Sequence, residues 1–138
     1  MTFFYRLSIL FAFLLSMSLG NVNAADYVNG VTHLNQTELV EKLKDPNAVL
    51  IDIRTQAELN EGYIAGAVHL PISEIANDLS LLDPYLNKDL IFYCHVGSRV
   101  NALTNYLQNI GHPSKGNLFH LKGDIRAWKA RGKPLVTP

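Results

Sequence analysis

Apolar residues along this chain gather in short runs of two kinds. Compact blocks rich in β-branched and aromatic residues predict buried strands, at 31–34, 48–54, 67–71, 90–93 and 117–121. Between these blocks, apolar residues recur at helical spacing, which predicts amphipathic helices. Strands that alternate with helices in this way indicate one α/β domain, with a central parallel sheet flanked by helices on both faces.

Capping residues mark where several helices begin. Asn35 with Glu38, and Thr55 with Glu58, have the spacing of a capping box. A longer apolar stripe predicts one helix over 72–82, ended by an Asp-Pro pair. Two further helices are expected near the carboxyl end, one with Val100, Leu103, Leu107 and Ile110 as its apolar face and one running from Asp124 through Ile125 and Trp128.

The first 24 residues have the pattern of a secretory signal peptide. Arg6 supplies the positive n-region, and 7–19 is an uncharged apolar stretch. Val22 and Ala24 suit the −3 and −1 positions of a cleavage site, and cleavage after Ala25 fits nearly as well. The alternative is an uncleaved anchor, but the apolar stretch is shorter than the roughly 20 residues of a spanning helix. We therefore expect a periplasmic or secreted domain over 25–138, without a stable membrane anchor.

Charge is balanced, which narrows the choice of partners. The chain has 12 Lys and Arg against 12 Asp and Glu, and loss of Arg6 with the leader would leave eleven against twelve. The absence of a long basic run argues against nucleic acid as a partner. The sequence carries no signal for a particular oligomeric state.

Cys94 is the only cysteine of the chain, and it lies between a predicted strand and a predicted helix. The free N–H groups and the dipole of a helix N-terminus stabilise an anion there, so a thiolate is favoured. Gly97 lets the loop turn its backbone N–H groups inward, and Arg99 adds a cation. In an exported chain an unpaired thiol is either an intermolecular partner or a reactive centre. The alternative is a buried, inert cysteine.

Other candidate residues share the strand ends with Cys94. Asp52, Arg54 and the pair Gly123-Asp124 follow predicted strands, and parallel sheets bind ligands beyond the carboxyl ends of their strands. Arg54 could instead form a structural ion pair with Glu58, four residues later. His95 borders the cysteine but is expected to face solvent. The remaining histidines and Trp128 are interpreted as ordinary strand, loop or core residues, and zinc-like ligand spacing is absent from the sequence.

Taken in order, these segments resemble the rhodanese homology domain. The residues that carry the resemblance are Asp52-Ile-Arg54, Glu58, Gly62 to Pro71, Cys94-x-x-Gly97-x-Arg99 and Gly123-Asp-Ile-x-Ala127-Trp128. They span nearly the whole chain after the leader, which makes it similar to small periplasmic thiosulfate sulfurtransferases of bacteria.

The resemblance implies a reaction at Cys94 and a single rhodanese-like domain. The thiolate would take the sulfane sulfur of thiosulfate or a related donor, and the resulting persulfide would pass it to a thiol or to cyanide. The loop His95, Val96, Gly97, Ser98 and Arg99 would hold the anions, with Asp52 and Arg54 in support. No cofactor and no metal is implied, because cysteine is both nucleophile and carrier.

The length of the Cys94 loop, and two residues that differ from the usual pattern of the family, refine this expectation. Four residues separate Cys94 from Arg99, whereas the fold-sharing phosphatases and arsenate reductases use a loop one residue longer. A small phosphatase is therefore the weaker hypothesis. Tyr63 stands where the family usually has histidine, and Asp124 where it usually has glycine. Asp124 either caps the last helix or faces the crevice, where it would repel an anionic donor; the alternative function is then a persulfide carrier with little thiosulfate turnover.

Overall fold

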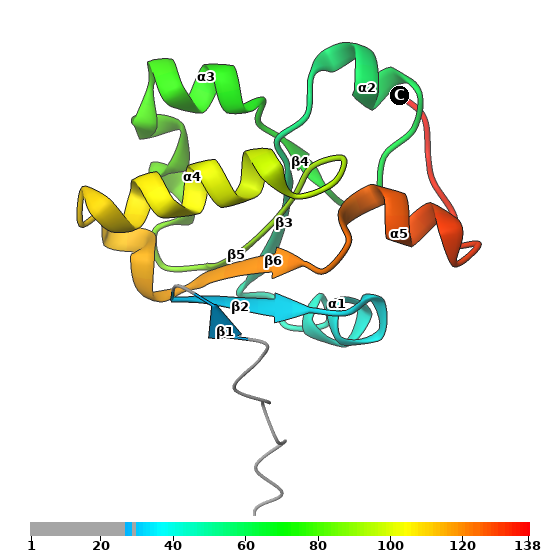
Figure 1. Cartoon of the computed structure of the whole chain (residues 1–138), viewed down its shortest axis with the longest axis horizontal. Helices are drawn as coiled ribbons and strands as arrows, with labels where there is room; N and C mark the ends of the chain where they lie inside the picture. Colours follow the sequence, from blue (N-terminus) through cyan, green and yellow to red (C-terminus); the bar gives the residue numbers. More distant parts are fainter. Residues whose placement is uncertain (1–26, 29) are drawn as a thin grey trace, which may run out of the picture.

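The computed structural model describes residues 27–28 and 30–138, and the predicted leader lies outside them. Six strands form one sheet in the order β1-β2-β6-β5-β3-β4 (Figure 1). All neighbouring pairs are parallel except β1 with β2. The strands are β1 Tyr27–Val28, β2 Val31–Leu34, β3 Ala48–Asp52, β4 Val68–His69, β5 Asp89–Tyr93 and β6 Leu118–Leu121. The parallel α/β sheet expected from the sequence is confirmed, and the antiparallel edge strand β1 was missed.

Helices cover both faces of this sheet, as predicted. They are α1 Gln36–Lys42, α2 Gln56–Asn60, α3 Ile72–Asn77, the 3₁₀ helix η2 Leu79–Tyr85, α4 Ser98–Asn109, the 3₁₀ helix η3 Pro113–Gly116 and α5 Asp124–Ala130. Both predicted capping boxes are present, at Asn35 with Glu38 and at Thr55 with Glu58.

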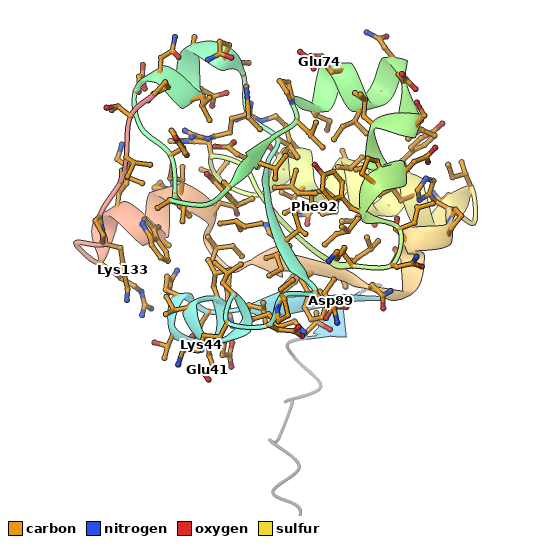
Figure 2. The ribbon with its side chains drawn as sticks, turned by 180° about the vertical axis from the view of Figure 1, so that it is seen from behind. Glu41, Lys44, Glu74, Asp89, Phe92 and Lys133 are labelled. Atoms are coloured by element: carbon orange, nitrogen blue, oxygen red, sulfur yellow. The ribbon has the colours of Figure 1, made fainter. Side chains whose placement is uncertain are left out.

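Two apolar clusters form the core, one on each side of the sheet. Successive side chains of a strand point to opposite faces. On β5, Leu90 and Phe92 therefore pack with the α3, η2 and α4 side, together with Cys94 just beyond the strand. Ile91 and Tyr93 pack with the α1 and α5 side, where Trp128 is a core residue as expected. Figure 2 shows Phe92 in the interior and Glu74 and Lys133 at the periphery.

The segment 72–82 differs from the single helix that its apolar stripe predicted. The α-helix ends at Asn77 because Asp78 is extended, with φ −147°. The Asp78 carboxylate accepts the Ser80 N–H at 3.0 Å and starts a separate 3₁₀ helix that contains Pro84. Local capping by Asp78 thus outweighs the continuous apolar pattern.

One residue of the apolar face predicted for α4 is exposed instead of buried. Val100, Leu103 and Leu107 are buried, but Ile110 is 47% exposed. Ile110 is the C-cap of α4, where the helix ends before Gly111 with φ +65°. The apolar face therefore stops one turn earlier than its spacing suggested.

Strand register brings the functional segments to one edge. Asp52 is level with Tyr93 across β3 and β5, and Phe92 is level with His120 across β5 and β6. Because the strands are parallel, the segments that follow all three leave the sheet on the same side. Within the described residues no helix has the length and apolar character needed to cross a membrane.

Candidate active site

Cys94 lies directly after β5, at the entrance to α4. Its side chain is fully buried and is a free thiol. The backbone N–H of Gly97 donates to the Cys94 Sγ at 3.1 Å. Gly97 has φ +104° and is the N-cap of α4, a twelve-residue helix. The sulfur thus faces a turned-in N–H group at a helix N-terminus, an arrangement that stabilises a negative charge on sulfur.

Arg99 lies at the rim of this site and is held by Glu58. Its Nη1 and Nη2 donate to the two carboxylate oxygens of Glu58, both at 2.7 Å. This bond, helped by the Thr55 N–H, lowers the pKa of Glu58 to about 2. The pKa of Arg99 is raised, first by Glu58 and then by its interaction with Cys94. Both side chains of the pair remain about 30% exposed. Arg99 therefore links the loop to α2 while lying close to the sulfur.

Asp52 and Arg54 form a buried unit on the other side of the strand end. Arg54 Nη2 donates to Asp52 Oδ2 at 2.7 Å, and the same guanidinium donates to the carbonyl of Gly62 at 2.8 Å. The Tyr93 hydroxyl donates to Asp52 Oδ2 at 2.7 Å, and burial, followed by the Asp52 charge, raises the pKa of Tyr93. Since Tyr93 and Cys94 point to opposite faces, this unit supports the backbone before Cys94 rather than the sulfur itself.

These contacts correct the expected Arg54–Glu58 ion pair and identify the acid that holds Arg99. The Arg54 side chain forms its ion pair with Asp52. Its hydrogen bond to Glu58 is to the backbone carbonyl of that residue, at 3.2 Å, and not to the carboxylate. The acid that holds Arg99 is Glu58. The capping box accounts for the contact with Arg99, because it turns the Glu58 carboxylate back toward the start of α2, where Arg99 meets it.

Asp124 is buried beneath the loop and does not cap α5. The N-cap of that helix is Gly123, which makes no side-chain cap hydrogen bond. Instead Asp124 Oδ1 accepts the backbone N–H of Cys94 at 2.8 Å. His120 Nε2 lies 3.0 Å from both carboxylate oxygens. The carboxylate therefore lies beneath the loop, against the backbone of Cys94.

The remaining loop positions are open to solvent. His95 and Ser98 are exposed, and Val96 is 47% exposed. His95 was expected to face solvent, and it does. The described part of the chain contains no group of three or more His, Cys, Asp or Glu side chains arranged to hold a metal ion.

Glu58 and His120 are the site residues whose roles the sequence left unassigned. Glu58 was visible as a capping residue, but its reach to Arg99 depends on how α2 packs beside the loop. His120 lies in a predicted strand of mostly apolar residues, so its immediate neighbours give it no functional signal. Its position near Cys94 follows from the β5–β6 register, which pairs His120 with Phe92. The one available signal was the spacing of His120 and Asp124, four residues apart.

Comparison with known proteins identifies relatives of this chain in sequence and in structure. A sulfurtransferase of Allochromatium vinosum is 34% identical over 109 residues, covering 78% of this chain and 97% of that protein. A rhodanese-related protein of Thermoplasma volcanium has a TM-score of 0.64 at 28% identity, covering 77% of this chain and 98% of that structure. A thiosulfate sulfurtransferase of Pseudomonas aeruginosa has a TM-score of 0.64 at 25% identity, covering 78% of this chain but 20% of that structure.

These relatives support sulfur transfer as the general chemistry of the domain. The sequence profile of the rhodanese-like domain matches residues 35–131, which include β3, β5, β6 and the whole Cys94 loop. The chain belongs to the rhodanese-like domain family.

Proposed function

We propose that this protein is a sulfurtransferase in which Cys94 is the nucleophile and the sulfur carrier. In the first half-reaction, the Cys94 thiolate attacks the outer sulfur of thiosulfate or a related donor. A Cys94 S–S bond forms, the donor S–S bond breaks, and sulfite leaves with the electron pair. The product is a Cys94 persulfide.

In the second half-reaction, an acceptor thiolate or cyanide attacks the outer sulfur of the persulfide. The new bond forms on the acceptor, and the electron pair returns to Cys94 as thiolate. The acceptor leaves as a persulfide, or as thiocyanate. Neither half-reaction needs an external oxidant, a metal or an organic cofactor.

The observation that carries the proposal is the Gly97 N–H on the Cys94 sulfur at 3.1 Å. The same turned-in loop, at the N-terminus of α4, suits a persulfide anion because its donors are fixed before the reaction. Arg99 is a partly exposed cation that interacts with Cys94 and is accessible to an arriving donor. The four-residue gap between Cys94 and Arg99 favours one sulfur atom over a tetrahedral oxyanion.

The second candidate is a persulfide carrier with little thiosulfate turnover. Arg99 already shares its charge with Glu58, which reduces what it offers to a dianion. The Asp124 carboxylate beneath the loop also opposes additional negative charge. A persulfide delivered by a partner protein brings less charge to the site than thiosulfate does.

Thiocyanate formation from thiosulfate and cyanide tests the first proposal. Wild-type protein should turn over repeatedly, and Cys94→Ser should be inactive because an alcohol cannot carry the sulfur. Loading of wild type without repeated turnover would favour the carrier. Turnover that survives in Cys94→Ser would contradict both.

We also propose that the protein is exported, from the signal-peptide pattern of residues 1–24. The amino-terminal residue of protein recovered from the periplasm or medium tests this. It should be Ala25 or Asp26, and an intact Met1 on membrane-bound protein would contradict it.

A further inference from the structure

We propose that Asp124 and His120 form a buried pair that positions the nucleophile of the proposed sulfurtransferase. In this role the Asp124 carboxylate fixes the backbone of Cys94, and His120 fixes the carboxylate. Asp124 is a positioning residue, since it contacts the backbone of Cys94 and not the sulfur. The inference rests on the proposed function and extends it to residues outside the sulfur-binding loop.

Asp124 contacts the backbone of Cys94 from the buried side of the loop. Its side chain is 1% exposed and accepts the Cys94 N–H at 2.8 Å. The next residue donates as well, because the Ile125 N–H meets the Cys94 carbonyl at 3.2 Å. Both polar groups of the Cys94 backbone are thus held by the start of α5. A shift of this segment would move the sulfur.

The same carboxylate shapes the loop that faces the sulfur. A Cβ atom added to Gly97 would lie 2.9 Å from Asp124 Oδ2 and 3.1 Å from His120 Cε1. The loop therefore rests directly on the buried pair. Gly97, whose N–H donates to the sulfur, thus packs against the carboxylate and the imidazole with no room for a side chain.

This arrangement is costly for the fold, which suggests a function beyond packing. Asp124 is the one described non-glycine residue with positive φ, at +54°. Among the described residues, His120 Nδ1 is also the one buried side-chain nitrogen or oxygen without a hydrogen-bond partner. Strained backbone and unpaired buried polar groups persist mainly where function requires them. A glycine at 124 would relieve the strain but leave the Cys94 N–H without this acceptor.

Two substitutions at position 124 separate positioning from stability. Asp124→Gly accepts the positive φ and removes the carboxylate. Asp124→Asn tolerates the same backbone region and keeps an oxygen that can accept the Cys94 N–H. Asp89→Asn is the matched control, because Asp89 begins β5 at the opposite end of the strand and pairs with Lys42.

The test measures three quantities on each full-length variant: the melting temperature, hydrogen exchange of the Cys94 amide, and the rate of sulfur loading from thiosulfate. In Asp124→Gly we expect a melting temperature close to that of wild type, because relief of the positive φ offsets the loss of a buried hydrogen bond. We also expect faster exchange at Cys94, and loading slowed by about tenfold to a hundredfold, as misplaced reacting groups produce. Asp124→Asn should keep slow exchange and most of the loading rate. Asp89→Asn should load like wild type.

The outcomes distinguish this inference from the proposed function. If wild type loads and Asp124→Gly loads equally fast, the pair has only a structural role and the inference is overturned. The same holds if Asp124→Gly slows loading while the Cys94 amide stays protected. If wild type takes up no sulfur, the proposed function fails, and the positioning role falls with it.

Discussion

Two arginine–carboxylate pairs flank the end of β5, and they differ in burial rather than in chemistry. Arg54 and Asp52 have side chains that are 5% and 0% exposed, whereas Arg99 and Glu58 are 30% and 29% exposed. Arg54 is surrounded by fixed acceptors, including the carbonyls of Gly62 and Glu58. Arg99 has one carboxylate and the sulfur of Cys94.

The difference in burial decides which of the two arginines a ligand can reach. The buried pair cannot release its guanidinium to a ligand without leaving the Asp52 charge uncompensated in the core. The rim pair is within reach of solvent, so an anionic donor can compete with Glu58 for Arg99. An Asp-x-Arg motif at a strand end is thus a structural clamp here, and the arginine of the loop is the one available to a donor.

Removal of the buried guanidinium should have the largest effect on stability. Arg54→Gln should lower the free energy of unfolding by about 3–5 kcal/mol, because it leaves the buried Asp52 charge uncompensated and removes the guanidinium from two carbonyls. Urea denaturation measures this. A loss below about 1 kcal/mol would show that the Asp52 site is hydrated and that the contrast in burial is overstated.

Removal of the rim guanidinium should affect chemistry more than stability. Arg99→Gln should slow sulfur loading from thiosulfate by at least about tenfold, since it removes the cation beside Cys94. The free energy of unfolding should change by no more than about 1 kcal/mol. Arg131→Gln, at an exposed position after α5, is the matched control and should load normally. Normal loading in Arg99→Gln would show that the backbone N–H groups suffice for the donor.

Neutralising the acid of the rim pair should have a smaller effect of opposite sign. Glu58→Gln keeps an oxygen for the Thr55 N–H but no longer competes for the Arg99 charge. Loading from thiosulfate should rise a few-fold, while loading from an uncharged donor should stay the same. Equal changes with both donors would mean that Glu58 positions Arg99 rather than competing with the donor for its charge.

The smallest expected effect is a pH dependence of stability from Glu58. Its pKa in the folded protein, about 2, is below its ordinary value of 4.5. The stabilisation is therefore complete above pH 4.5 and is lost as pH falls toward 2. Acid titration of the melting temperature should show a shallower decline in Glu58→Gln than in wild type. Parallel curves would show that Arg99 does not hold Glu58 in solution.

The fold was largely predictable from the sequence because its signals are local. The strand 90–93 and both capping boxes depend on neighbouring residues, and the structure confirms them. The break at Asp78 was missed because a side chain competing for the backbone leaves the apolar spacing unchanged.

The site was predictable in outline but not in its contacts. Cys94, Gly97 and Arg99 are close in sequence, so their proximity followed from a single loop. The partners of that loop come from two other segments: Glu58 lies 41 residues from Arg99, and Asp124 lies 30 residues from Cys94. Which carboxylate pairs with which arginine depends on how the helices pack, and the spacing of residues in the sequence does not predict it.

The central claim is that Cys94 carries sulfur, and intact mass spectrometry tests it most directly. After treatment with thiosulfate, wild-type protein should gain the mass of one sulfur atom and lose it when a thiol is added. Cys94→Ser should gain nothing. An unchanged wild-type mass with both thiosulfate and an organic persulfide, or an equal gain in Cys94→Ser, would contradict the account.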